Sequence, residues 1–253
     1  MLRFSPANAK LKRMKENDGI AGFLIGRRKI YSLDLLSGHS CPFAQDCLSK
    51  VIVDNGKRKI QDGPDTKFRC FSASQEVLFP DLYNLRSGNL TSLRQLSLDE
   101  IIKLIESSLP PDLGVCRLHV GGDFFNPTYF YAWVNVARNH KDKLFYAYTK
   151  SLSYWIKHRS EIPNNLVLTA SYGGRLDNLI SQYGLRSSKV IYSESQAEML
   201  DLEIDHDDSH AADPNKRDQS FALLIHNTQP KGSEAAKALQ ELRKNKVQHS
   251  YSR

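Results

Sequence analysis

Short apolar runs recur along the chain, each followed by a polar or glycine-bearing turn and then by a helical pattern. The runs cover residues 30–36, 115–120, 144–149, 166–171, 189–194 and 221–226. The intervening segments carry apolar side chains at helical spacing and predict helices over 91–109, 126–140, 151–160, 175–184 and 233–246. Strands that alternate with helices predict right-handed βαβ units and a mostly parallel sheet.

The α/β pattern fits a complete or partial parallel (β/α) barrel, and an open doubly wound sheet is the alternative. In either architecture the chemistry gathers at the carboxyl ends of the strands. No internal repeat or long linker divides the chain, so we expect a single domain over residues 1–253. Within it, 1–29 is a basic N-terminal extension, 30–240 the barrel-like core and 241–253 a basic C-terminal tail.

Composition narrows the class of protein. Hydrophobic residues make up 40% and charged residues 25% of 253 positions, as in ordinary globular proteins. No segment approaches the roughly 18 consecutive apolar residues of a membrane span, and the N-terminal segment lacks the apolar stretch of a secretory signal. We therefore expect a cytoplasmic protein that has no membrane partner and keeps its thiols reduced.

The net charge of +7 concentrates in basic clusters at residues 10–15, 27–29 and 57–59. Such clusters can contact nucleic acid nonspecifically, because they neutralise phosphates. The alternative is a solvated basic face, since no nucleic-acid-binding motif accompanies the charge.

Three of the four cysteines follow the first predicted strand. Cys41 and Cys47 come directly after it, and Cys70 follows a basic loop in the same strand-to-helix connection. Thiolates are ligands for zinc or for an iron–sulfur cluster. The C-x₅-C pair and the gap of 22 residues before Cys70 differ from the paired C-x₂₋₄-C spacing of structural zinc. Three thiolates on one loop favour a cluster that leaves one iron free for another ligand.

The fourth ligand of such a centre is Cys116, His119 or an exogenous molecule. Strand alternation puts Cys116 and Leu118 on one apolar face, which predicts an inert buried thiol. Arg117 and His119 lie on the opposite face, where His119 is a hydrogen-bonded interior imidazole or a metal ligand.

Glycine-bearing turns follow two of the strands. Gly121, Gly122 and Asp123 end the second run, where the glycines can let a ligand approach and Asp123 can accept a hydrogen bond from an amine or a hydroxyl. The alternative is a tight turn in which Asp123 caps a helix. Arg175 offers a fork for a carboxylate or a phosphate in the second turn, and Lys150 can reach the same end of the sheet.

A dense acidic and histidine run covers residues 204–213. It includes His206, Asp207 and His210, which could bind a divalent metal or transfer protons. The alternative is a solvated acidic loop.

Several stretches, among them SGHSCPFAQDC, RLHVGGDFFNP and IHNTQPKGSEAAKAL, resemble a family of phage-encoded proteins, the "gene product 88"-like family, over residues 30–240. The chain more distantly resembles the radical-SAM superfamily. Those enzymes have a TIM-like parallel (β/α) barrel, three cysteines after the first strand and a GGE-like turn that holds the amine of S-adenosylmethionine.

The radical-SAM resemblance implies that Cys41, Cys47 and Cys70 each bind one iron of a [4Fe–4S] cluster. It also implies that the turn 121–123 stands where the GGE-like turn stands, beside bound S-adenosylmethionine. Two features depart from the superfamily pattern. The usual cysteine spacing is C-x₃-C-x₂-C, and Asp123 is one methylene shorter than the usual glutamate.

These observations lead to three functional hypotheses. The first is a phage-encoded iron–sulfur protein in the host cytoplasm that performs redox or radical chemistry on a small-molecule ligand with S-adenosylmethionine. The second is a non-catalytic protein, stabilised by a cluster or zinc, that binds nucleic acid or a host protein. The third makes residues 205–213 a metal-dependent hydrolase site.

Overall fold

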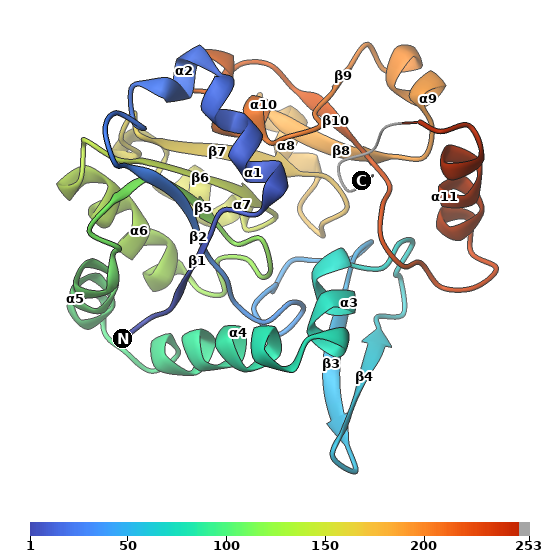
Figure 1. Ribbon diagram of the computed structural model, residues 1–253, viewed down its shortest axis with the longest axis horizontal. Helices are drawn as coiled ribbons and strands as arrows, with labels where there is room; N and C mark the ends of the chain where they lie inside the picture. Colours follow the sequence, from blue (N-terminus) through green and yellow to red (C-terminus); the bar gives the residue numbers. More distant parts are fainter. Residues whose placement is uncertain (248–253) are drawn as a thin grey trace.

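An eight-stranded sheet forms the centre of the protein in the computed structural model, which describes residues 1–247 (Figure 1). The strand order is β1-β2-β5-β6-β7-β8-β10-β9. The strands are β1 (Phe4–Pro6), β2 (Lys29–Leu33), β5 (Leu113–Leu118), β6 (Leu144–Thr149), β7 (Leu166–Ser171), β8 (Ser187–Ile191), β9 (Glu203–Ile204) and β10 (Phe221–Leu224). Only β1 pairs antiparallel with its neighbour, so the predicted mostly parallel α/β sheet is confirmed.

The sheet is open over the described residues. Its edge strands are β1 and β9, and no pairing within residues 1–247 joins them. Closure into a complete barrel is therefore not observed. All six predicted strands form in the predicted order, and β6 and β7 match the expected residues from end to end.

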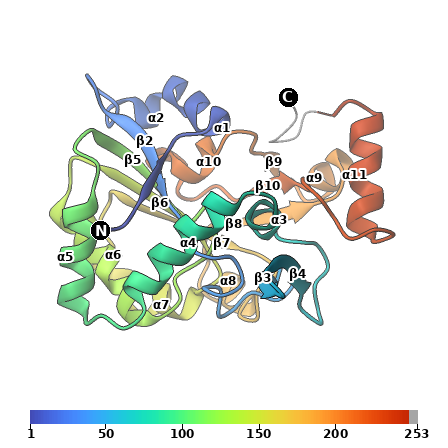
Figure 2. The same ribbon diagram turned by 60° about the horizontal axis from the view of Figure 1, so that its bottom comes forward.

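Helices cover both faces of the sheet. They are α1 (Ala9–Arg13), α2 (Asp18–Ala21), α3 (Phe71–Leu78), α4 (Pro80–Leu93), α5 (Leu98–Ser108), α6 (Pro127–Asn139), α7 (Leu152–Lys157), α8 (Asn178–Gln182), α9 (Glu194–Met199), α10 (Ser209–Ala212) and α11 (Glu234–Lys244). Helices α5, α6 and α7 lie on one side, and α1, α2 and α10 lie on the other (Figure 2). Cys116 and Trp133 belong to the core on the first side, and Met14 and Tyr146 belong to the core on the second.

Helix boundaries follow capping side chains. The Asn126 side chain accepts a hydrogen bond from the Tyr129 amide at 2.7 Å, and Pro127 occupies the first helical position of α6, as predicted. The helix predicted over 91–109 is instead the end of α4 and the whole of α5. Ser97 starts α5 because it forms a capping box with Glu100.

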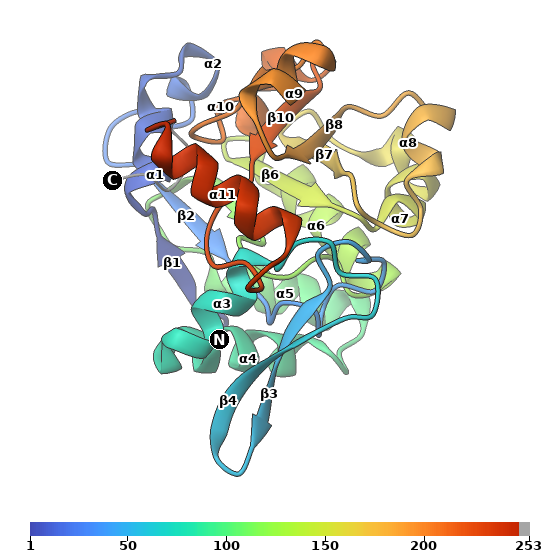
Figure 3. The same cartoon turned by 90° about the vertical axis from the view of Figure 1, so that its right-hand side faces the viewer.

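A β-hairpin interrupts the connection between the second and third cysteines. It consists of β3 (Ser49–Asp54) and β4 (Lys57–Asp62) and projects from the body of the protein (Figures 1 and 3). Asn55 and Gly56 form its turn with φ angles of 48° and 73°. Asn-Gly is the preferred pair for a two-residue hairpin turn, so the sequence carries a local signal for this hairpin, although its basic charge suggests only a loop.

The chain ends contribute differently to the fold. Residues 1–29, expected as an extension, supply β1, α1 and α2, and they bury Leu11, Met14 and Ile20 against the sheet. The predicted basic tail begins within α11, and its residues 248–253 lie outside the described part of the chain. No helix within residues 1–247 is long and apolar enough to span a membrane.

Candidate functional site

A cavity of about 170 Å³ lies at the carboxyl ends of β5, β6, β7 and β10. The predicted site residues in its wall are Cys41, Cys47, Cys70, His119, Gly122, Asp123 and Lys150. Other predicted residues lie outside the wall, namely Cys116, Gly121, Arg175, His206, Asp207 and His210. The fold thus brings the three cysteines to the turn at 121–123, although Cys41 and Cys70 lie 29 positions apart in the sequence.

Backbone hydrogen bonds fix the segment that carries the first two cysteines. The amides of Gln45 and Asp46 donate to the carbonyl of Gly173 at 3.1 and 2.9 Å. The amide of Arg175 donates in return to the carbonyl of Phe43 at 2.9 Å. The segment 41–47 is therefore docked on the turn that follows β7. The Arg175 side chain itself is exposed.

A buried charged group positions the third cysteine. Cys70 immediately precedes α3, whose Glu76 is fully buried. Glu76 Oε1 accepts hydrogen bonds from the amide and hydroxyl of Ser37 at 3.1 and 2.9 Å and from Arg86 Nη1 at 3.0 Å. Burial raises the pKa of Glu76, and Arg86 opposes that effect. This contact joins α3 to the loop that leads into Cys41.

The two glycines of the turn allow the cysteine-bearing segments to approach it closely. Gly122 has a φ of +93°, and a Cβ there would lie 2.5 Å from Ser40 Oγ. A Cβ on Gly121 would lie 2.4 Å from Ser72 Oγ. The sequence suggested that a ligand approaches these glycines, whereas the contacts at this distance are with the protein itself.

The three cysteines are half-buried free thiols that influence one another. Burial raises the pKa of Cys41 well above its usual range, and negative charge on Asp123, Cys70 and Cys47 adds to the effect. Burial and Cys47 likewise raise the pKa of Cys70 to about 11. A bound metal centre deprotonates its thiol ligands, so it would offset this cost.

A site for a single metal ion requires several ligand side chains that converge on one point. Within residues 1–247, no three His, Cys, Asp or Glu side chains converge closely enough to hold one ion. In a [4Fe–4S] cluster each cysteine binds a different iron, so the ligands need not converge on one point.

The two protein candidates for the fourth ligand differ in position. Cys116 is fully buried in the core beneath α6, as predicted for an inert thiol, and burial raises its pKa strongly. His119 lies in the cavity wall with a φ of 67°, and its Nε2 is 3.0 Å from the Tyr129 hydroxyl. Burial, followed by the charge of Arg117, lowers the pKa of His119 to about 3. His119 is therefore a neutral, hydrogen-bonded imidazole.

Asp123 is buried and already accepts several hydrogen bonds. Its Oδ1 accepts from the Phe124 amide and the Thr149 hydroxyl, both at 2.7 Å. Its Oδ2 accepts from the Lys150 amide at 2.8 Å. Burial raises the pKa of Asp123, and these donors oppose it. Asp123 thus holds the turn against the end of β6, and Oδ2 keeps capacity for one further donor.

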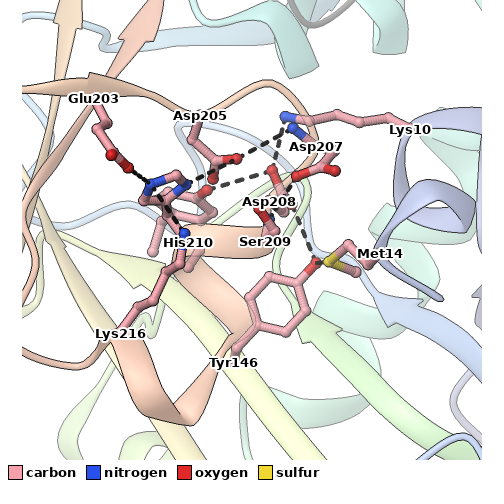
Figure 4. A network of polar contacts seen from close by, with 12 residues as sticks. Lys10, Met14, Tyr146, Glu203, Asp205, Asp207, Asp208, Ser209, His210 and Lys216 are labelled. Carbon is pink, nitrogen blue, oxygen red and sulfur yellow. Dashed lines mark hydrogen bonds and ion pairs between the residues drawn. The ribbon is translucent and has the colours of Figure 1, made fainter. Parts of the chain in front are cut away.

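A buried charged cluster forms another part of the wall and was not anticipated from the sequence. Lys10 Nζ lies 2.7 Å from Asp208 Oδ1, and the Tyr146 hydroxyl donates to Asp208 Oδ2 at 3.1 Å (Figure 4). Arg117 forms an ion pair with the same carboxylate. Burial opposes ionisation, but Arg117 and Lys10 lower the pKa of Asp208 to about 2. Asp208 belongs to the acidic run, whereas Lys10 comes from the N-terminal segment.

The rest of the acidic run forms a network outside the cavity wall. His210 Nε2 lies 2.5 Å from Glu203 Oε2, and His210 Nδ1 lies 3.7 Å from Asp205 Oδ1 (Figure 4). Asp205 and Glu203 raise the pKa of His210 against the effect of its burial. Asp207 accepts a hydrogen bond from the Ser209 amide at 2.9 Å, an arrangement typical of a turn.

The fold and the cavity define an α/β protein with an open, mostly parallel sheet and a thiol-lined site at the carboxyl ends of its strands. The chain belongs to the family described as "Gene product 88", whose family model matches residues 2–246.

Two curated relatives come from mycobacteriophages. The Gene 88 protein of Mycobacterium phage L5 is 31% identical over 134 residues, which cover 52% of this chain and 51% of the relative. The Gene 88 protein of Mycobacterium phage D29 is 32% identical over 116 residues, which cover 45% of this chain and 43% of the relative. The chain thus spans about half the length of the relatives it matches. No solved structure gives a significant match.

Proposed function

We propose that this protein binds a [4Fe–4S] cluster through Cys41, Cys47 and Cys70 and uses it in redox or radical chemistry. The observation that carries the proposal is that three half-buried thiols line one cavity at the carboxyl end of a parallel sheet. Parallel α/β sheets place ligands at this end. The thiolate set suits an iron–sulfur centre, and with three protein thiolates one iron stays open to a further ligand.

The resemblance of the sequence to radical-SAM enzymes is the reason for proposing this chemistry. The first two cysteines follow β2, the first parallel strand of the chain, and the glycine-bearing turn follows β5, its neighbour in the sheet. We propose that the open sheet, with β1 and β9 as its edge strands, is a partial barrel. The cysteine spacing remains a departure from the superfamily pattern.

S-adenosylmethionine is the second ligand that this resemblance implies. Asp123 Oδ2 has capacity for one donor, such as the amine of that ligand, and Gly122 and Lys150 line the same wall. When bound, the cluster supplies one-electron chemistry. The chain's own residues bind and orient the ligand and limit its contact with water, because the surrounding wall includes the apolar side chains of Phe68, Val190 and others.

Anaerobic reconstitution with iron and sulfide tests the cluster. We expect about four irons and four sulfides per chain for the unmodified protein and for Cys116→Ser, and a marked loss for Cys70→Ser. Cys116 is the matched control because it is a cysteine outside the cavity wall. Zinc in place of iron, or equal iron content in all three proteins, contradicts the proposal.

Incubation with S-adenosylmethionine under reducing conditions tests the radical chemistry separately. Release of 5′-deoxyadenosine supports the use of this ligand. A protein that contains the cluster but releases neither 5′-deoxyadenosine nor methionine is an iron–sulfur protein without radical-SAM activity.

Nucleic-acid binding is a second candidate function, which the projecting β3–β4 hairpin supports. Two-stranded ribbons of this shape can enter the major groove of DNA. Lys57 is exposed near its tip, whereas Lys59 is paired with Asp54 at 2.6 Å and Arg58 lies 5.8 Å from the ring centre of Tyr83. Binding that weakens steeply with salt and is lost in Lys57→Glu supports this function, and salt-independent behaviour contradicts it.

A further inference from the structure

Lys150 lies beside the first two cysteines. It directly follows β6, and its Cβ and Cγ would each lie 3.2 Å from a Cβ placed on Gly174. The carbonyl oxygen of Phe43, from the segment that carries Cys41 and Cys47, lies 3.1 Å from the same point. The Lys150 stem therefore packs at the place where the cysteine segment docks on the turn after β7.

The ammonium group of Lys150 is anchored and keeps unused donors. Its Nζ donates to Ser171 Oγ at 2.7 Å, which uses one of its three N–H groups. Asp123 and Asp177 are the nearby carboxylates, and backbone amides occupy both: the Lys150 amide reaches Asp123, and two amides of the β7 turn reach Asp177 at 2.8 and 2.9 Å. No carboxylate within residues 1–247 comes within 4.0 Å of Lys150 Nζ.

Other cationic side chains in the cavity wall are committed to carboxylates. Lys10 and Arg117 pair with Asp208, and Arg69 pairs with Asp62 at 2.5 Å. The charge of Lys150 has no such direct partner within residues 1–247, so its field acts on a group bound among the three cysteines of the same wall.

The charges around Lys150 favour the protonated form of its side chain. Burial disfavours the charged form of Lys150, but Cys47, Asp123, Asp177 and Cys41 outweigh it and raise the pKa. Cys47 is the largest of these favourable influences. Lys150 therefore carries its proton at neutral pH.

We propose that Lys150 is a positioning residue whose fixed positive charge in the cavity wall raises the reduction potential of the bound cluster. This inference rests on the proposed cluster. Reduction adds one negative charge to the centre, and a nearby ammonium in a partly desolvated site stabilises that charge.

Redox titration of four proteins tests the inference: the unmodified chain, Lys150→Met, Lys150→Arg and Lys189→Met. Lys189 is the matched control, since it is also half-buried but lies outside the cavity wall, 5.7 Å from the ring centre of Tyr172. We expect Lys150→Met to weaken one-electron reduction at least tenfold, or about 59 mV. Lys150→Arg should restore most of the loss, and Lys189→Met should match the unmodified protein. An unchanged potential in Lys150→Met, with normal iron and sulfide, overturns the inference.

Iron and sulfide content of the four proteins separates failure of the inference from failure of the proposed function. An unmodified chain that binds no iron after anaerobic reconstitution overturns the proposed function and this inference with it. If Lys150→Met holds no cluster while Lys150→Arg does, the charge is required for assembly, which supports the inference. If neither Lys150 variant holds a cluster while Lys189→Met does, the lysine side chain itself and not its charge is required, which overturns the inference.

Discussion

Replacement of Asp208 by asparagine should destabilise the protein strongly. Asp208 is 1% exposed and neutralises two buried cations, Lys10 at 2.7 Å and Arg117. Asparagine preserves the size of the side chain but removes its charge, which leaves two like charges buried side by side. Breaking a buried ion pair in this way costs about 3–5 kcal/mol of unfolding free energy.

The lowered pKa of Asp208 gives a second value for the contribution of its charge to the free energy of unfolding. A fall from 3.8 to about 2 on folding corresponds to about 2 kcal/mol of stability. Because the folded pKa is the lower one, this contribution is complete above about pH 4 and disappears as the pH falls through about 2. The difference between the unmodified protein and Asp208→Asn should therefore shrink over that interval.

Urea unfolding at pH 7 and at low pH measures both effects. Asp142→Asn is the control, since Asp142 is about half exposed and pairs with Arg28 at 2.8 Å at the surface, where loss of the pair costs about 0–1 kcal/mol. If Asp208→Asn cost no more than Asp142→Asn at pH 7, the buried cluster would not have the stabilising role assigned to it. If the stability difference between the unmodified protein and Asp208→Asn stayed constant down to pH 2, the lowered pKa assigned to Asp208 would be refuted.

Three further substitutions probe local features by urea unfolding. Gly122→Ala should cost about 2–5 kcal/mol of unfolding free energy, because Gly122 has a left-handed φ and its new Cβ would meet Ser40. The control Gly232→Ala should cost only about 1–2 kcal/mol, because Gly232 has a φ of +82° but open space around it. Equal losses would contradict the close approach of Ser40 to Gly122. Cys116→Ser should lose about 1–3 kcal/mol because it buries a hydroxyl in an apolar core, and it should leave cluster content unchanged. Asn126→Ala should lose about 1 kcal/mol through its N-cap, and an unchanged midpoint would argue against that cap.

The sequence predicted the sheet well because each strand carries its own local signal. The six predicted strands are largely buried apolar runs, and turns bound them in the sequence. The helix expected over 91–109 is one error, because Ser97 restarts the helix after a short break. The open edges of the sheet depend instead on long-range pairing, which no local pattern specifies.

The candidate site was predictable where chain topology determines it. Cys41, Cys47 and the turn after β5 meet because parallel strands present their carboxyl ends at one edge. The contribution of Lys10 was not predictable, since it reaches Asp208 from the N-terminal segment across nearly 200 positions of sequence. His210 was a candidate on composition alone, and the fold pairs it with Glu203 outside the cavity wall.

The visible absorption spectrum of the anaerobically isolated protein tests the cluster most directly. We expect the broad visible absorption of an iron–sulfur centre in the unmodified chain, its bleaching on reduction, and its absence when Cys41, Cys47 and Cys70 are all replaced by serine. A colourless protein after reconstitution, or a spectrum that survives the triple replacement, would contradict a cluster held by these three cysteines.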